Sequence, residues 1–513
     1  MAADPPASDA LVIQALVTEL QGQLRMAQAE NARLRHQLTQ ALRRLYGRKT
    51  EQLAGADQGT LPLGPPADAA AEATPDDAPD DPDPAAAPGE RPRRQRGRTP
   101  LPKDLPRQRT VLEPDASALT CAHCTTAKTR IGEDVTEELE FEPAVLRVHE
   151  YVRPKYACPA CEAGVVQAAL PPRPIDQGRP GPGLLAHVVT AKYADHLPLH
   201  RQEGIFARHG VGLSRRTLCD WVAAVAELVA PIVAEMRRTV LASHVIHSDD
   251  TRITVQAPGH RGGSRRGYLW VYGGDQGDLV YDYTASRGRD GPLHFLRNYH
   301  GYLQADAYAG YDGVFATGMV TQLGCWAHGR RYVFEAVDTA LEPATRLLAL
   351  IRRLYAVERE ATGRQLDAAG RQALRAAESR PLLAAIEAEV TTLTPTVLPK
   401  SPFGEALGYL RRQWQALTRY VEDGALAIDN NASERALRMV AVGRKNWLFA
   451  GSEAGAQRAA TLYSLIATCK LHRLDPFAYL RDVIARVATH PMRRIAELTP
   501  RGWQAQRLAA TTG

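Results

Sequence analysis

The chain has 513 residues, and its 63 Lys and Arg side chains against 57 Asp and Glu give a formal net charge of +6. This length predicts three or four domains, and 44% hydrophobic residues suffice for large cores, which excludes a wholly disordered protein. No apolar run approaches the roughly 20 residues that span a bilayer, and the N-terminus lacks a secretory signal. Seven cysteines are few for a chain of this length, and an odd number cannot all form pairs, which argues against a disulfide scaffold. We therefore expect a cytoplasmic protein in a reducing compartment, with no membrane segment.

The first 54 residues predict a zipper-like helix. Apolar positions between residues 10 and 52 are spaced alternately by four and three, as in a heptad seam. The seam consists of Ile13, Val17, Leu20, Leu24, Ala27, Asn31, Leu34, Leu38, Ala41 and Leu45. A coiled coil is the favoured interpretation for residues 1–54, with Asn31 setting the register of a dimer. An amphipathic helix packed on its own chain is the alternative.

Residues 55–100 predict a disordered acidic linker followed by a basic arm. Residues 56–90 contain nine Asp and Glu and no Lys or Arg, and residues 91–98 contain five Arg. A segment of this composition cannot bury enough apolar surface to fold. It is either a flexible, solubilising linker or an arm for DNA that the acidic tract masks when DNA is absent.

Two C-x2-C pairs predict a zinc ribbon over residues 101–175. A strand-rich stretch at residues 135–153 separates the two pairs. The four cysteines are Cys121, Cys124, Cys158 and Cys161. Each pair supplies two thiolates at one turn, as tetrahedral zinc requires, and four thiolates leave no open position for water. We therefore expect one structural Zn²⁺.

Residues 176–240 predict a helix-turn-helix DNA-binding domain. One helix ends near His209 and Gly210, and a short turn leads to Ser214, which is a good N-cap for the next helix. The first turn of that second helix carries Arg215, Arg216 and Thr217. In a helix-turn-helix these side chains would face the bases of the major groove. An ordinary helical hairpin has the same pattern, but the preceding zinc ribbon and basic arm favour DNA binding.

From residue 241 to residue 335 the pattern changes to strands. Three β-branched segments form a predicted antiparallel meander, followed by a helix at GRDGPLHFLRNY and a fourth strand at GYLQADAY. Asp249 and Asp250 interrupt the first strand, and Asp306 ends the fourth, although strands disfavour Asp. Solvation at a turn or a strand edge would explain either position alone.

Helices dominate the rest of the chain. Residues 336–425 predict a helical insertion, and residues 453–513 predict a helical tail whose last twenty or so residues fray. Between them, residues 426–452 predict a helix with Glu434 in or near its first turn. Glu434 and Arg438 are four residues apart and could form a plain surface ion pair.

The order of zinc ribbon, helix-turn-helix, two strand aspartates and a helix glutamate resembles the transposases of the insertion sequence 66 family, over nearly the whole chain. The similar segments are LRRLYGRKTEQL, RGRTPLPKDLPR, HSDDT, LQADAYAGY, CWAHGRR, DNNASERALR and GRKNWLFAGSEAGAQRAA. The family has D-E-T where this chain has Asp249, Asp250 and Thr251, so the first acid is retained and the second differs.

The resemblance implies a multidomain α+β chain with a ribonuclease-H-like catalytic core, a mixed sheet flanked by helices. It also implies a catalytic triad of Asp249, Asp306 and Glu434 that holds two Mg²⁺ ions per active site, for which Mn²⁺ can substitute. Three carboxylates suit such hard cations, which prefer oxygen ligands. Strand alternation does not decide whether Asp249 or Asp250 faces the metals, so the motif alone favours Asp249.

The activity implied by the resemblance is DNA transposition. The enzyme would bind the ends of an insertion sequence, cleave them to expose 3′-OH groups, and join these to target DNA. Its partners would be double-stranded DNA, further copies of the chain in a homodimer or higher oligomer, and small accessory proteins encoded by the same element. It would act in the bacterial cytoplasm, on the nucleoid when bound. A domesticated or inactive DNA-binding protein is the alternative, and a nuclease without strand transfer is a third reading.

Further candidate DNA contacts come from two of the family-like segments. Arg330 and Arg331 lie in CWAHGRR, which either braces the active site or touches DNA. Arg444 and Lys445 lie beside Trp447, an arrangement that suits a phosphate clamp with base stacking. Alternatively, Trp447 belongs to the core and the two basic residues are solvated. Because residues 56–90 carry a charge of −9, the rest of the chain carries +15, as expected for a DNA-binding protein.

Overall fold

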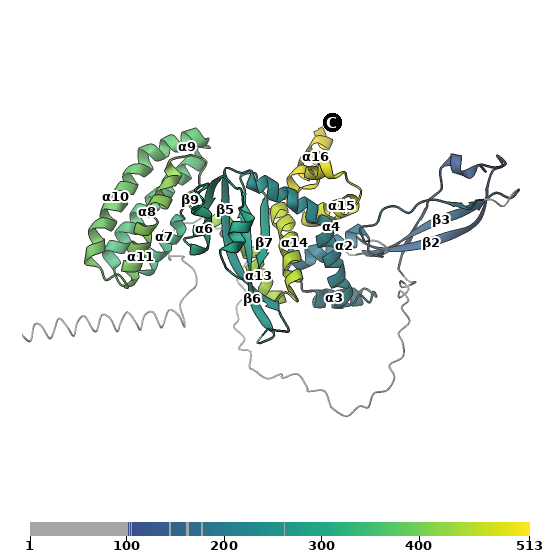
Figure 1. Ribbon diagram of the computed structural model, residues 1–513, viewed down its shortest axis with the longest axis horizontal. Coiled ribbons are helices and arrows are strands. Elements are labelled where there is room, and N and C mark those ends of the chain that lie inside the picture. The colour runs from purple at the N-terminus through teal and green to yellow at the C-terminus, as the bar shows by residue number, and fades with distance from the viewer. Residues whose placement is uncertain are drawn as a thin grey trace, which may run out of the picture. The chain divides into compact units, whose positions relative to one another are not determined.

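The computed structural model describes residues 101–512, apart from residues 102, 104, 143–144, 161–163, 176–177 and 261. The predictions for the zipper helix and for the whole of the linker and arm therefore lie outside the described residues. The described part is a mixed α+β fold with two sheets and several groups of helices (Figure 1).

The segment predicted as a zinc ribbon contains a long antiparallel hairpin (Figure 1). β2 (Thr129–Glu142) pairs with β3 (Val145–Ala157), and together the two strands extend beyond both ends of the predicted stretch at residues 135–153. β3 also pairs with β1 (Arg107–Val111) and with the short β4 (Val166–Gln167). A 3-10 turn, η1 (Ala116–Leu119), precedes the first cysteine pair. Because this pair comes just before β2 and Cys158 comes just after β3, these cysteines lie at the open end of the hairpin, where Thr129 pairs with Ala157.

Three helices follow: α2 (Pro182–Tyr193), α3 (Leu199–Arg208) and α4 (Arg215–Leu241). The predicted turn between the last two is confirmed, because Gly210 has φ +79° and Ser214 Oγ accepts a hydrogen bond from the Thr217 amide at 3.1 Å. α4 is longer than a typical recognition helix, and its apolar side joins the same core as the neighbouring sheet. The three helices therefore do not have a core of their own.

The length and hydropathy of α4 are relevant to the prediction that the chain has no membrane segment. Among the described residues, it is a helix long and apolar enough to cross a membrane by length and composition alone. Its Val225, Val229 and Ile232 side chains are completely buried in the main core. A core helix of this kind passes the same test as a membrane span, so the test does not distinguish the two.

A five-stranded sheet occupies the middle of the described chain. In chain order its strands are β5 (Val245–Gln256), β6 (Ser264–Gly273), β7 (Leu279–Thr284), β8 (Gly301–Gln304) and β9 (Val320–Leu323). Their spatial order is β7-β6-β5-β8-β9. The first three form the predicted antiparallel meander, whereas β8 and β9 run parallel to β5. The connections contain α5 (Asp290–Phe295), the turn η2 (Ala309–Tyr311) and α6 (Asp312–Phe315).

The predicted helical insertion is confirmed as helical. After α7 (Trp326–Glu335) its main helices are α8 (Leu341–Gly363), α9 (Ala368–Leu374), α10 (Arg380–Leu393), α11 (Pro402–Arg412) and α12 (Trp414–Thr418). The short turns are η3 (Arg375–Ser379), η4 (Thr394–Thr396) and η5 (Arg419–Val421). These helices enclose a second hydrophobic cluster, so the insertion has its own packing (Figure 1).

The remaining helices return to the main core. They are α13 (Asn431–Trp447), α14 (Glu453–Leu471), α15 (Pro476–Arg486), the 3-10 helix η6 (Met492–Leu498) and α16 (Pro500–Thr512). α14 covers the outer edge of β7, where Ser464 Oγ accepts from the Tyr281 amide at 2.8 Å and Thr468 Oγ1 from the Leu279 amide at 2.9 Å. The expectation that the last twenty or so residues fray is wrong for the described residues, because α16 is helical and buries Trp503.

Candidate active site

Two neighbouring parallel strands bring Asp249 and Asp306 together. His247 of β5 pairs with Gln304 of β8, and each aspartate lies two residues further along its strand direction. Because the strands run the same way, both carboxylates lie at the same end of this strand pair. The sequence placed each aspartate on a strand but did not predict that these two strands are adjacent.

Glu434 reaches the same end from the first turn of α13. Asn430, just before the helix, is fully buried and donates from Nδ2 to the Ser248 carbonyl oxygen at 2.8 Å. Its Oδ1 lies 3.3 Å from His247 Nδ1, and its backbone amide donates to Cys325 Sγ at 3.3 Å. Asn430 therefore ties the start of the glutamate helix to the strand that carries Asp249.

The three carboxylates influence one another electrostatically. Burial is the largest cause that raises the pKa of Asp249 to about 7, and the nearby charges of Asp306, Asp250 and Glu434 raise it further. Glu434 Oε1 is buried without a hydrogen-bond partner among the described residues. A set of crowded carboxylates with an unpartnered oxygen fits a hard divalent cation, which prefers oxygen ligands and neutralises their charge.

Asp250 faces a different partner from Asp249. Its side chain is only 5% exposed, and Arg287 donates from Nε to Oδ1 at 2.8 Å and to Oδ2 at 3.1 Å. The Arg287 guanidinium also lies 3.8 Å from the centre of the Tyr308 ring and 3.9 Å from Asp306 Oδ2. Sequence reasoning missed Arg287, which lies with Arg289 in the loop between β7 and α5 and belongs to no recognisable motif.

α7 supplies two neighbours for Glu434, a histidine and an arginine. His328 Nε2 lies 3.8 Å from Glu434 Oε1, and Arg331 Nη2 lies 3.9 Å from Oε2. Trp326 anchors this helix, since it is fully buried and donates from Nε1 to the Leu417 carbonyl oxygen at 2.8 Å. The surface ion pair between Glu434 and Arg438, the alternative interpretation, is not formed among the described residues, where Arg438 is exposed.

The three residues of the predicted phosphate clamp at the end of α13 have different surroundings. Arg444 donates from Nη1 to Thr251 Oγ1 at 2.8 Å and to the Arg252 carbonyl oxygen at 2.6 Å, so it joins the helix to β5. Trp447 packs against the main core, with Lys192 Nζ 5.9 Å from its ring centre. Lys445 is exposed. Of the two interpretations, the packing favours Trp447 as a core residue.

In the helix-turn-helix region, the candidate DNA-contacting residues begin α4. Arg215 and Arg216 are exposed, whereas Thr217 is partly buried and its amide donates to the Ser214 N-cap. The Arg215 amide donates to Glu203 Oε1 at 3.1 Å, which links α4 to α3. The first turn of α4, capped by Ser214, therefore presents two exposed basic side chains.

Three of the four predicted zinc ligands lie together. The Sγ atoms of Cys121, Cys124 and Cys158 are all within 4.8 Å of one another, and Cys161 lies outside the described residues. Thiolates arranged tetrahedrally about zinc at roughly 2.3 Å are about 3.8 Å apart, so this spacing fits the ion. The hydrogen bond with Thr126 is the largest cause that lowers the pKa of Cys124 to about 6, which favours the thiolate that zinc binds.

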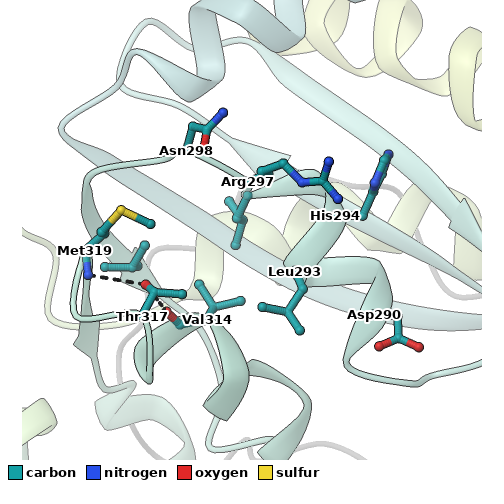
Figure 2. Close-up of a pocket in the computed structure, with 10 residues that line it drawn as sticks. Asp290, Leu293, His294, Arg297, Asn298, Val314, Thr317 and Met319 are labelled. Carbon is teal, nitrogen blue, oxygen red and sulfur yellow. Dashed lines mark hydrogen bonds between the residues drawn. The ribbon is translucent and has the colours of Figure 1, made fainter.

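A separate cavity of about 500 Å³ lies between α5, α6 and β9. Figure 2 shows Leu293 and Val314 facing each other across it, with His294 and Arg297 along one side. None of the candidate carboxylates lines this cavity. It is therefore not the candidate active site.

Comparison with known proteins covers most of the chain. The family model described as "Transposase IS66 family" matches residues 177–458, and "zinc-finger binding domain of transposase IS66" matches residues 119–162. "IS66 C-terminal element" matches residues 464–501, and "Transposase C of IS166 homeodomain" matches residues 33–110.

Similar proteins occur in Sinorhizobium fredii (strain NBRC 101917 / NGR234). Uncharacterized protein y4hP is 36% identical over 440 residues, which span 81% of this chain and 78% of that protein. Uncharacterized protein y4jD is 33% identical over 425 residues, which span 80% of this chain and 82% of that protein. The similarity therefore extends well beyond the segments that carry the candidate carboxylates.

Proposed function

The chain belongs to the IS66 transposase family, and from that premise we propose that it cleaves the ends of its element and joins them to target DNA. The observation that carries this proposal is the convergence of Asp249, Asp306 and Glu434 from two strands and a distant helix. Carboxylates gathered in this way are the donors that phosphodiester transfer requires.

A ribonuclease-H-like fold for the catalytic core belongs to this proposal. The strand order β7-β6-β5-β8-β9 supports it, with an antiparallel meander on one side and two parallel strands on the other. The helical insertion between β9 and α13 is compatible with such a core, because it lies between elements rather than within the sheet.

We assign the metal site to Asp249, Asp306 and Glu434. Two Mg²⁺ ions, or Mn²⁺ in their place, would supply the activation of the nucleophile and the stabilisation of the leaving oxygen. Asp249 would lie between the other two carboxylates, since both raise its pKa, whereas only Asp306 acts on Asp250 in this way. Asp250 would instead hold Arg287 beside the site.

The chain's own groups then have distinct tasks. The carboxylates would position the attacking oxygen, first of water and then of the exposed 3′-OH, in line with the scissile phosphate. His328 and Arg331 would hold Glu434 in place, and Arg331 would offset its charge before DNA arrives. Arg330 and Arg331 also lie on α7 at this end of the molecule, where we expect them to meet phosphates.

DNA binding would use two further places. Arg215, Arg216 and Thr217 would enter the major groove in the manner of a helix-turn-helix, which their position at the start of α4 supports. Lys445 would contact phosphate, whereas the bonds of Arg444 to β5 favour a structural role. One structural Zn²⁺ would hold the ribbon. Assembly as a dimer or larger oligomer and dependence on accessory proteins remain part of the proposal.

A strand-joining assay tests this function. Purified protein, Mg²⁺ and labelled duplexes carrying the inverted repeats that flank the gene should give joined products, and Asp306→Asn or Glu434→Gln should abolish joining while the duplexes remain bound. The matched control is Asp338→Asn, an acid outside the site. Binding without joining by the unmodified protein would favour the inactive DNA-binding alternative, and cleavage without joining would indicate a nuclease.

A further inference from the structure

The chain makes a strained turn immediately after α13. Leu448 has φ 60° and ψ −46°, and the Phe449 amide donates to the Trp447 carbonyl oxygen at 2.7 Å. These values describe a γ-turn with positive φ, which is rare and strained for a residue with a β-carbon. Leu448 is nevertheless 65% exposed and Phe449 45% exposed. Neither the strain nor the exposure of two large apolar side chains stabilises the isolated fold.

The turn is held firmly on both sides. Before it, Arg444 bonds to Thr251 and to the backbone of Arg252. After it, the Ala450 amide donates to the Thr254 carbonyl oxygen at 2.8 Å, and the Ala450 carbonyl oxygen accepts from the Gln256 amide at 2.8 Å. Hydrogen bonds on both sides of the two exposed side chains therefore fix their turn against β5, the strand that carries Asp249.

A basic ridge leads from the carboxylates to this turn. Arg435, Arg438, Val442 and Lys445 are exposed, and their spacing of three, four and three residues places them on one face of α13. In the part of the chain that the structure describes, the three basic side chains make no ion pair. At 1.5 Å per residue, the turn lies about 20 Å along the helix from Glu434, or roughly six base pairs of B-DNA.

We propose that this ridge follows a DNA strand by its phosphates and that Leu448 and Phe449 insert into a base step, which they unstack. The proposal rests on the proposed function and names a DNA contact of the same site. Unpaired positive charge along the ridge suits phosphate, and apolar wedges on a rigid turn suit a base step. The sequence suggested stacking by Trp447, but that ring is packed in the core, and the exposed ring is Phe449.

Base unstacking can be measured directly. We would place 2-aminopurine singly at each of the first ten positions from the cleaved end of the inverted-repeat duplex and record fluorescence with the full-length protein. The unmodified protein should raise the fluorescence at one step, about six positions from the end. Phe449→Ala should abolish this rise and reduce joining at least tenfold, with little change in the melting temperature.

Two further variants separate the wedge from general stability. Leu448→Gly relieves the strained backbone, so the melting temperature should stay level or rise while the fluorescence signal falls. Arg438→Ala should lower the slope of log affinity against log salt by about one. The controls are Leu398→Ala and Arg359→Ala, an exposed apolar and an exposed basic residue of the insertion, which should change none of these readouts.

The outcomes distinguish the wedge from the proposed function. Unmodified protein that joins DNA without any unstacking, or Phe449→Ala that keeps the full signal, would overturn the wedge and leave transposition standing. Loss of self-association in Phe449→Ala, with unchanged DNA signals, would also overturn it and assign the turn to a second copy of the chain. Failure of the unmodified protein to bind the duplex would contradict both.

Discussion

Asp250 and the start of the glutamate helix are each held by a partner from a distant part of the chain. Arg287 lies 37 residues from Asp250, and Asn430 lies 182 residues from Ser248. Residue type and motif pointed to Asp249, Asp306 and Glu434 as candidates in the sequence. Arg287 and Asn430 could not be selected, because their roles depend on contacts that only the folded chain creates. The same contacts give Asp249 and Asp250 different surroundings, which alternation along the strand did not predict.

Arg375 is the clearest case of a single residue that organises its surroundings. It is 1% exposed, and Glu358 accepts hydrogen bonds from its Nε and Nη2, each at 2.8 Å. Its other donors reach three backbone carbonyl oxygens, those of Tyr420, Asp423 and Leu426. One guanidinium thus joins η3, which is a short π-helix, to the segment that leads into the glutamate helix.

Replacing this residue should destabilise the insertion. In Arg375→Ala the partly buried Glu358 loses its main partner, and three carbonyl oxygens lose their donor. Removing one member of such a buried pair lowers the free energy of unfolding by about 3–5 kcal/mol. Thermal unfolding should therefore begin at a clearly lower temperature. Arg359→Ala, on the exposed side of α8, serves as the control and should change the melting temperature little. Equal melting temperatures for the two variants would contradict the role assigned to Arg375.

At the level of elements, local signals predicted the helices better than the strands. Gly210 marked the end of α3 and Ser214 the start of α4, because positive φ and helix capping depend on adjacent residues. The hairpin of β2 and β3 was underestimated, since its outer residues include exposed Ile131 and Val135 that do not follow a clean alternation. The adjacency of β5 and β8 was not predictable from local pattern, because strand order is a property of the whole sheet.

The zinc ribbon gives a prediction at this scale. The purified protein should contain about one tightly bound zinc per chain. Cys121→Ser should lower the zinc content and expose the hairpin of β2 and β3 to protease, because the cysteines close its open end. The helical signal in circular dichroism should hardly change. Cys219→Ser alters an exposed cysteine outside the cluster and is the control. A full zinc content in Cys121→Ser would rule out this ligand set.

At the scale of the whole molecule, packing divides the described chain differently from the sequence prediction. The helix-turn-helix, the five-stranded sheet and the C-terminal helices share one hydrophobic cluster. The insertion encloses a second cluster that meets the sheet through Val245 and Leu323. The sequence predicted the helices of each segment, but shared cores depend on which apolar faces meet, and helix periodicity does not specify that.

Charge distribution makes a prediction for the full chain. Residues 56–90 carry nine acidic side chains and precede five Arg, whereas the net charge is only +6. Changing those nine acids to Asn and Gln keeps the length of the linker and removes its charge. Non-specific affinity for DNA should rise, with a steeper dependence on salt, if the tract masks the basic arm. Unchanged affinity and slope in fluorescence anisotropy would leave the tract as a solubilising linker.

The central claim is that Asp249, Asp306 and Glu434 hold the metal ions of a strand-joining enzyme. The most direct measurement replaces Asp249 or Asp306 by Cys and compares joining in Mg²⁺ with joining in Mn²⁺ or Cd²⁺. A thiolate is a poor ligand for Mg²⁺ and a better one for softer ions. We predict that both variants are inactive in Mg²⁺ and regain joining in the softer ions, whereas Asp250→Cys does not show this switch. Full activity of Asp249→Cys and Asp306→Cys in Mg²⁺ would contradict the account.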